Sequence, residues 1–235
     1  MKKIFLGLAL LSVFAVSCRE EEEDNTVRKE ETAAVQNEYD DLAAQQFLKD
    51  YYFDSRGNLM AFSSSITTDD AEKPLDTYNP VKLPSGVIYI IRYVPQNGKA
   101  IGATDKINLM HRTTTFIASK EENVVKFTSP MVFRNTITGG GFPEVDPSYY
   151  YVKQSVLDAD KTKTRSYYEI EGFQEGLKHF LSTETANSEN YNLQGVIIIP
   201  SRAAFAKDPH YLYSGFSLKD RSFVFNFQVY RTEAR

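Results

Sequence analysis

Apolar residues recur at helical spacing in two segments of the chain. In residues 38–52, Ala43, Phe47 and Tyr51 follow one another at intervals of four. In residues 172–182, the apolar positions with this spacing are Phe173, Leu177, Phe180 and Leu181. Such spacing aligns apolar side chains along one side of a helix. The sequence therefore predicts one amphipathic helix in each segment.

Further segments carry the residue types or the alternation of β-strands: residues 86–94, 105–115, 124–133, 195–199 and 222–229. The run 195–199 is apolar throughout, which is typical of a strand buried on both faces, and Pro200 ends its hydrogen-bond ladder. In 222–229 phenylalanine alternates with mostly polar residues, so one face of this strand is aromatic. A short helix packed across an aromatic-faced antiparallel sheet predicts the α+β fold class, with the first helix as an N-terminal extension.

The first residues have the pattern of an export signal. Two lysines precede an apolar run, residues 4–16, which is too short to span a bilayer as a stable helix. The run leads into Ala15–Cys18 (AVSC), which resembles the lipobox of bacterial lipoproteins, where the cysteine is acylated. We expect residues 1–17 to be a lipoprotein signal peptide and Cys18 to carry the lipid. The alternative is an ordinary secretory signal with an incidental cysteine.

An acidic block follows Cys18. Residues 19–24 read REEEED, a composition that stays solvated because its charges repel one another. The block resembles the acidic stretch behind the acylated cysteine in Bacteroidetes lipoproteins that are exported to the cell surface. We expect an outer membrane lipoprotein that faces the periplasm or is displayed on the surface, and the acidic block favours the surface. Residues 18–37 are then a flexible tether.

The rest of the chain divides into a helical N-terminal segment with a loop, residues 38–82, and one domain, residues 83–235. Three glycines at 139–141 open a polar, tyrosine-rich stretch, which we expect to be an insertion over residues 139–165. Its run Tyr149–Tyr151 suits a protein interface and a β-strand equally well.

The composition argues against several classes of function. With Lys+Arg 27 and Asp+Glu 31 the net charge is -4, and no basic stripe is interleaved with aromatic residues, so no nucleic acid partner is expected. Cys18 is the sole cysteine, which excludes an intrachain disulfide and a cysteine-based zinc site. The histidines lack metal-site spacing, and the sequence has neither a G-x-S-x-G motif nor a P-loop. We expect no metal, no cofactor, and neither hydrolase nor nucleotide chemistry.

Three segments in the last third of the chain resemble one known family in order and spacing. Ile170–Leu177 (IEGFQEGL) resembles the V-I-x-G-W-E-E-G-L segment of FKBP-type peptidyl-prolyl isomerases. Ile198–Phe205 (IIPSRAAF) resembles their I-P-S-x-L-A-Y segment, and Phe223–Val229 (FVFNFQV) resembles their last strand, L-V-F-D-V-E-L. Looser matches at 105–113 and 126–129 extend the resemblance over about residues 86–231. The whole layout is similar to the FKBP-like lipoproteins of Bacteroidetes, some of which are associated with gliding motility.

The resemblance implies an FKBP-like antiparallel sheet wrapped around one short helix, with an apolar pocket for a prolyl side chain. Proline-containing polypeptides would be the partners, because both isomers of an X-Pro bond are populated and exchange slowly. Rotation about an amide bond has a barrier of about 18–20 kcal/mol. A dry pocket that favours the twisted amide lowers this barrier without a nucleophile.

By matching position, the resemblance also implies the residues of this pocket. Phe127, Phe173, Phe205 and Phe225 would carry catalysis, with Phe173 as the floor, and His111, Phe133 and Ile170 would bind substrate. Phe205 stands where a tyrosine hydroxyl usually holds the substrate carbonyl, Thr128 where an aspartate is usual, and His111 where another tyrosine is usual. Each lost hydrogen bond to substrate costs about 0.5–1.5 kcal/mol, so we expect reduced turnover.

Three functions stay open at this point. The first is a membrane-anchored prolyl isomerase that helps envelope or surface proteins to fold. The second is a non-catalytic binding or chaperone-like module, and the third is a structural component of an envelope complex. A groove filled by Phe205 or by residues 139–165 would favour the third. Nothing in the sequence predicts an oligomeric state.

Overall fold

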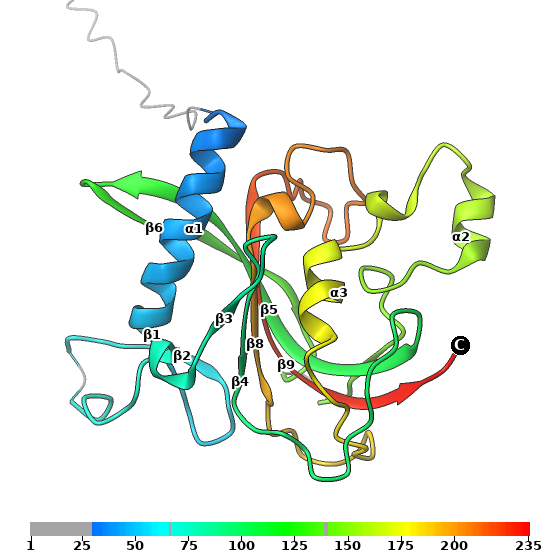
Figure 1. Ribbon diagram of the computed structural model, residues 1–235, viewed down its shortest axis with the longest axis horizontal. Helices are drawn as coiled ribbons and strands as arrows, with labels where there is room; N and C mark the ends of the chain where they lie inside the picture. Colours follow the sequence, from blue (N-terminus) through cyan, green and yellow to red (C-terminus); the bar gives the residue numbers. More distant parts are fainter. Residues whose placement is uncertain (1–29, 66, 139–140) are drawn as a thin grey trace, which may run out of the picture. The chain divides into compact units, whose positions relative to one another are not determined.

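The main sheet of the molecule is antiparallel, with the strand order β3-β4-β8-β9-β5-β6 and with β7 paired to β5 (Figure 1). The computed structural model describes residues 30–65, 67–138 and 141–235. The strands are β3 (Val81–Lys82), β4 (Ile88–Ile91), β5 (Lys106–Glu121), β6 (Val124–Asn135), β7 (Glu144–Val145), β8 (Gly195–Ile199) and β9 (Arg221–Glu233). A separate hairpin joins β1 (Tyr51–Phe53) to β2 (Leu59–Ala61). The predicted signal peptide, Cys18 and the acidic block lie outside the described residues.

The helices of the described residues are few and mostly short. They are α1 (Ala33–Asp50), α2 (Gln154–Ala159) and α3 (Glu171–Leu177), with the 3-10 helices η1 (Leu75–Tyr78), η2 (Arg165–Tyr167) and η3 (Ser201–Ala203). Residues 32–235 form one compact unit. The α+β class, with an antiparallel sheet, one short helix against it and a helical N-terminal extension, is confirmed.

Helix α1 begins earlier than its apolar pattern predicts. Thr32 caps the helix, and its hydroxyl accepts a hydrogen bond from the Val35 amide at 3.3 Å. The tether predicted for residues 18–37 is therefore wrong for residues 33–37, which are helical. The helix ends at Asp50, because Tyr51 has extended backbone angles (φ -127°, ψ 154°) and starts β1.

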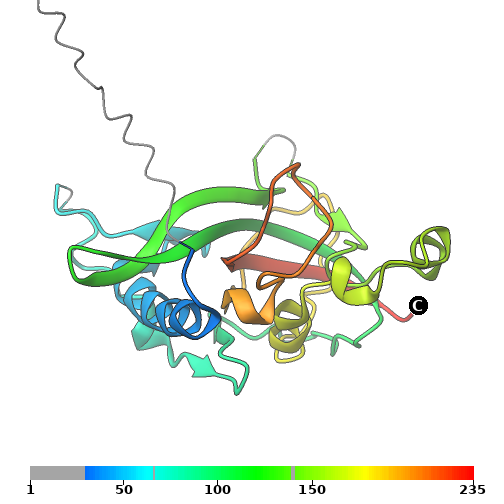
Figure 2. The same ribbon diagram turned by 90° about the horizontal axis from the view of Figure 1, so that it is seen from above.

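Strands β5 and β6 form a longer hairpin than their sequence pattern predicts. Glu122 and Asn123 make the connecting turn with φ values of 47° and 69°, the left-handed conformation that suits a tight hairpin. The turn lets β5 continue to Glu121, six residues beyond the predicted end at residue 115. Figure 2 shows the far end of this hairpin beside α1, and α1 packs against both strands.

The sheet has two buried faces with different contents. On the face toward α3, which we name the α3 face, β8 and β9 place Ile197, Ile199, Phe223, Phe225 and Phe227. The alternate residues lie on the other face, which we name the α1 face: Val196, Ile198 and Val224. Figure 1 shows α1 and α3 on opposite sides of β4 and β8. Both faces of β8 are therefore covered, as its continuous apolar run predicts.

Helix α3 lies so close to β8 that two of its positions require glycine. A Cβ atom at Gly172 would lie 2.5 Å from Ile199 Cγ2, and one at Gly176 would lie 2.8 Å from Ile197 Cγ2. Residues four apart share one side of a helix, so both glycines face the strand. The E-G-F-Q-E-G-L sequence thus allows the close approach that sets Phe173 against β9.

Candidate functional site

Most of the predicted pocket residues lie together on the α3 face. The Phe173 ring from α3 stacks on Phe225 from β9, with ring centroids 4.1 Å apart and planes inclined by 16°. Phe133 from β6 meets Phe225 edge-on at 6.3 Å. Ile170, directly before α3, and Phe205, two residues after η3, are buried in the same cluster. The structure therefore brings these five predicted residues into one aromatic cluster.

Phe127 is not part of this cluster, so its predicted catalytic position is wrong. Its ring lies on the α1 face, with centroids 5.9 Å from Phe47 and 5.2 Å from Phe116. Phe127 and Phe133 are six positions apart, an even offset that in a regular strand would put them on one face. In the structure the two side chains lie on opposite faces of the sheet, Phe133 on the α3 face and Phe127 on the α1 face.

A β-bulge in β6 explains why the two side chains part. Thr128 pairs with Ile117, but Met131 pairs with Thr115, so three steps along β6 match two steps along β5. Such an extra residue reverses the side-chain alternation beyond it. Ser129 lies inside the bulge with a φ of 49°. The Thr128 hydroxyl is used within the hairpin, where it donates to the Ile117 carbonyl at 3.1 Å.

Tyr149 fills the centre of the predicted pocket. Its side chain is 1% exposed, and its ring centroid lies 5.2 Å from that of Phe133, 5.9 Å from Phe225 and 6.0 Å from Phe173. Tyr213, from the loop between η3 and β9, covers Phe133 at 5.6 Å and Tyr149 at 5.9 Å. With both tyrosines in place, the residues predicted to bind a prolyl side chain are core residues.

The hydroxyl of Tyr149 belongs to a buried network of hydrogen bonds. It donates to Glu144 Oε2 at 2.7 Å, and His111 Nε2 lies 3.1 Å from the hydroxyl and 3.3 Å from the carboxylate. An ionised carboxylate only accepts, so the His111 proton is assigned to Nε2. Nδ1 then accepts from the Thr113 hydroxyl at 2.7 Å. His111, predicted to bind substrate, instead holds Tyr149 in place.

The directions of the pKa shifts indicate which group of the His111–Glu144–Tyr149 network is charged. Burial lowers the pKa of His111 despite the nearby Glu144 carboxylate, so the imidazole is neutral at pH 7. Burial alone would raise the pKa of Glu144, but the hydrogen bonds from His111 and Tyr149 outweigh it and leave that pKa below its ordinary value. Burial raises the pKa of Tyr149 well above its ordinary value. Glu144 therefore carries the negative charge, with Arg134 Nε 4.0 Å from it.

The loop between η3 and β9 is held over the cluster at several points. The Tyr213 hydroxyl donates to the Tyr168 carbonyl, and Arg134 Nη2 donates to the Tyr213 carbonyl at 3.1 Å. His210 stacks on Phe205 at 4.7 Å, and its Nε2 accepts from the Leu218 amide at 2.7 Å. Phe205 thus packs against a residue of its own loop.

Sequence reasoning missed the tyrosines that close the pocket. Neither interpretation of Tyr149–Tyr151 is right, because the run forms a turn in which the amides of Tyr150 and Tyr151 donate to the Pro147 carbonyl. The Tyr150 hydroxyl reaches the Gly102 carbonyl at 2.6 Å, and Tyr150 and Tyr149 are both buried in the α3-face cluster. The stretch predicted as an insertion therefore supplies core residues. The local signal for a turn was Asp146-Pro147-Ser148, because all three residue types favour turns.

Three further observations on the described residues bear on function. No group of three or more His, Cys, Asp or Glu side chains in the described part of the chain could bind a metal ion. Within residues 30–65, 67–138 and 141–235, no helix combines the length and the apolar character that crossing a membrane requires. A hollow of about 500 Å³ lies on the α1 face and is lined by residues that include Phe47, Phe127 and Arg112.

Comparison with known proteins found similarity among solved structures only. No protein-family model matches the sequence, and no curated protein matches it. A peptidyl-prolyl cis-trans isomerase from Pseudomonas syringae pv. tomato is similar at 12% identity and a TM-score of 0.39, over 87% of this chain and 98% of that one. FkpA from Escherichia coli is similar at 17% identity and a TM-score of 0.34, over 66% of this chain. The matched region spans 52% of the FkpA chain, about half its length.

Proposed function

We propose that this chain is an FKBP-like lipoprotein that serves as a non-catalytic binding or structural component of a cell-envelope complex and does not isomerise X-Pro bonds efficiently. The observation that carries the proposal is the Tyr149 ring, which packs on Phe133, Phe173 and Phe225 where a prolyl side chain would bind. The FKBP-like assignment rests on the motifs of α3, the Ile-Pro-Ser turn and β9, and on the packing of α3 across β8 and β9.

The energy needed to open the pocket argues against efficient catalysis. A prolyl side chain can enter only if Tyr149 leaves, which exposes Phe173 and Phe225 and breaks the hydrogen bond to Glu144. Removing a large buried aromatic side chain typically costs about 3–5 kcal/mol. An open state at that cost is populated about once in 10² to 10⁴ molecules, and substrate affinity falls by the same factor.

The anchoring part of the proposal rests on the sequence. The lipobox-like Ala15–Cys18, the short apolar run before it and the acidic block after it support acylation of Cys18 and an outer membrane location. The acidic block favours the cell surface over the periplasmic face. Acylation is tested by mass spectrometry of the mature protein, where an unmodified Cys18 would contradict this part.

Prolyl isomerisation is a second candidate, because the apolar walls of the family's pocket are kept. Phe133, Ile170, Phe173 and Phe225 meet on one face of the sheet. Isomerisation needs a dry apolar site and no nucleophile. The residues are therefore suited to the reaction if Tyr149 is displaced.

The exchange of proline isomers in a short peptide tests the proposal. We expect no acceleration by micromolar wild-type protein that begins at residue 19. Tyr149→Phe keeps the ring and should also be inactive, which makes it the matched control for Tyr149→Ala. Acceleration by Tyr149→Ala alone would show a competent pocket that the tyrosine blocks, in agreement with the proposal.

Acceleration by the wild-type protein would contradict the proposal and favour the second candidate. Equal acceleration by wild type and Tyr149→Phe, lost in Phe173→Leu, would place the activity in the α3-face cluster. Circular dichroism of each variant checks that the fold is intact.

A further inference from the structure

The loop between η3 and β9 carries a concentration of exposed apolar side chains. Tyr211 is 46% exposed, Leu212 is 53% exposed and Phe216 is 58% exposed. No other six-residue stretch in the described part of the chain exposes as many large apolar side chains. We name the segment that holds them, residues 209–218, the loop tip. Exposed apolar side chains that lie together mark contact surfaces for proteins or membranes, whereas scattered ones need no explanation.

The loop tip is fixed at its base and projects from the domain. At the base, His210 Nε2 accepts from the Leu218 amide at 2.7 Å, and Arg134 Nη2 donates to the Tyr213 carbonyl at 3.1 Å. Between these contacts, Gly215 turns the chain with a φ of 74°, and a Cβ atom there would have no atom within 4 Å. The outer turn of the loop tip therefore points away from the rest of the domain.

The loop tip contains no lysine, arginine, aspartate or glutamate. Residues 209–218 read PHYLYSGFSL, and charged residues flank them on both sides: Lys207, Asp208, Lys219 and Asp220. The Lys207 ammonium lies 3.7 Å from the Asp220 carboxylate, across the base of the loop. An apolar segment between flanking charges suits the interfacial region of a bilayer, where apolar side chains are buried and charged groups stay among the headgroups. Tyrosine is enriched at this depth, because its ring is apolar and its hydroxyl is polar.

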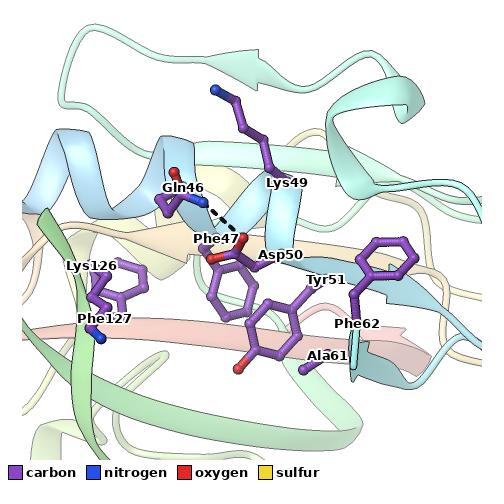
Figure 3. A pocket seen from close by; sticks show the side chains of 9 residues that line it. All are labelled: Gln46, Phe47, Lys49, Asp50, Tyr51, Ala61, Phe62, Lys126 and Phe127. Atoms are coloured by element: carbon purple, nitrogen blue, oxygen red, sulfur yellow. Dashed lines mark hydrogen bonds between the residues drawn. The ribbon is translucent and has the colours of Figure 1, made fainter. Parts of the chain in front are cut away.

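The partly open aromatic rings on the α1 face have a different setting. Phe47 and Tyr51 border a hollow of about 480 Å³ at the end of α1. Figure 3 shows Asp50 beside these rings and Lys126 to one side, and Lys49 also lines the hollow. Charged side chains are costly to bury in an apolar medium. The loop tip is therefore better suited than this hollow to contact a bilayer.

The loop begins beside the N-terminal half of α1. The Asp40 carboxylate accepts from the amide and the hydroxyl of Ser201 in η3, at 2.7 and 2.6 Å. Arg202, also in η3, donates from Nη1 to the Asn37 carbonyl at 3.2 Å. Figure 1 shows the first turns of α1 and the loop after η3 at the same end of the molecule. Thr32, which caps α1, and the loop tip therefore lie toward one end of the domain.

The expected lipid site precedes this end of the domain along the chain. Residues 18–31 connect Cys18 to Thr32, and a stretch of this length reaches at most about 50 Å. A lipid on Cys18 would keep the domain within that distance of the bilayer. The uncharged loop tip lies at the end of the domain to which the anchored segment is attached, which favours lipid over a protein as its partner.

We propose that the loop tip enters the interfacial region of the bilayer to which Cys18 is anchored, with Tyr211, Leu212 and Phe216 in contact with the lipid. The proposal rests on the anchoring part of the proposed function and adds a second membrane contact to it. Two contacts, unlike a single flexible anchor, would fix the orientation of the domain on the membrane. The α3 face and its closed pocket play no part in this contact.

A tethered fluorescence experiment tests the proposal. Cys18 is the sole cysteine and the chain has no tryptophan, so each can be used as a unique label. The mature chain that begins at Cys18 is coupled to phosphatidylcholine vesicles that contain a maleimide lipid, which replaces the natural acyl anchor. Phe216→Trp then places a single fluorophore in the loop tip. Its emission should shift to shorter wavelength on coupling and should be quenched by brominated phosphatidylcholine.

Matched variants show whether the contact belongs to the loop tip. Val94→Trp places the fluorophore at an exposed residue beyond the end of β4, and β4 is antiparallel to β8, so this residue lies at the opposite end of the sheet from η3. Its emission should stay unchanged. In the Phe216→Trp background, Leu212→Glu should lower the ratio of inserted to free loop about tenfold, because a buried apolar side chain is lost. Met60→Glu makes the same charge change at an exposed residue of β2 and should have no effect.

Some results would overturn the proposal. Unchanged emission and absence of quenching at residue 216 would do so and would favour a protein partner for the loop. Equal quenching at residues 216 and 94 would show adsorption without a preferred orientation. Equal effects of Leu212→Glu and Met60→Glu would place the membrane contact elsewhere. Chemical coupling makes these results independent of natural acylation, and mass spectrometry of Cys18 tests the anchor separately.

Discussion

The two faces of one sheet have opposite properties. The α3 face carries the segments that resemble motifs of FKBP-type prolyl isomerases, but Tyr149 and Tyr213 pack its aromatic residues into a closed core. The α1 face carries no such motif, yet its aromatic residues border open hollows beside Arg112. The comparison teaches that residues which resemble a binding-site motif can pack into a closed core, while an open hollow lies on a face without such a motif.

The largest expected effect separates the two faces by stability. Phe225→Ala should lower the free energy of unfolding by about 3–5 kcal/mol, because Phe225 is fully buried and stacks on Phe173. Phe127→Ala should cost less than about 2 kcal/mol, because this ring borders a hollow and buries less area. Urea unfolding measures both values. Equal losses would show that the two faces are packed alike and would remove the contrast between them.

A smaller effect tests how α1 is attached to the domain. Asp40 accepts from the Ser201 amide at 2.7 Å and from the Ser201 hydroxyl at 2.6 Å, so the helix is tied to the Ile-Pro-Ser turn by a buried carboxylate. Asp40→Ala leaves these donors without an acceptor and should cost about 1–3 kcal/mol. Asp41→Ala is the matched control, because its ion pairs with Lys82 and Arg202 are partly exposed and should be worth about 0–1 kcal/mol. If the control costs as much as Asp40→Ala, the buried tie is not what holds α1.

The smallest effect is a difference in pH dependence between the faces. Burial lowers the pKa of His111 below its ordinary value of 6.5. As the pH falls below 6.5, His111 is therefore protonated in the unfolded chain but stays neutral in the folded chain, which lowers the stability of the folded state. The α3 face should then lose up to about 1.4 kcal/mol per pH unit, until the pH reaches the folded-state pKa. Burial raises the pKa of Asp40 above 3.8, so the folded state binds this proton first and acidification stabilises the α1 attachment.

Unfolding measured between about pH 4 and pH 7 in wild type, His111→Gln and Asp40→Asn separates the two contributions. The His111→Gln curve should fall less steeply than wild type as the pH is lowered below 6.5. The Asp40→Asn curve should fall more steeply than wild type toward acidic pH. Parallel curves for all three proteins would show that neither group titrates differently in the folded and unfolded states.

The sequence predicts the fold well where the signal is local. The spacing of Phe173 and Leu177, the apolar run of β8 and the alternation in β9 all depend on neighbouring residues, and each produces the expected element. Buried polar residues weaken such signals. Gln36 lies on the buried side of α1 without adding to its apolar pattern, so the pattern alone predicts a helix that starts too late in the chain.

The site was less predictable because it depends on contacts between distant segments. Tyr149 reaches the cluster from a turn and Tyr213 from a loop, and neither position shows periodicity. Phe127 was misplaced because a bulge at Ser129 reverses the alternation of β6, which residue type alone does not reveal. The residues predicted from the motifs meet as expected: Phe133, Ile170, Phe173, Phe205 and Phe225. The two tyrosines that pack among them lie outside the motifs.

An NMR titration with an apolar prolyl ligand, such as an N-acylated proline amide, tests the closed pocket most directly. If Tyr149 keeps the α3 face closed, the resonances of Phe173, Phe225 and Tyr149 should stay unchanged in wild type as ligand is added. The same resonances in Tyr149→Ala report whether the cavity left by the ring accepts the ligand. Saturable shifts centred on Phe173 and Tyr149 in the wild-type protein would contradict a closed α3 face.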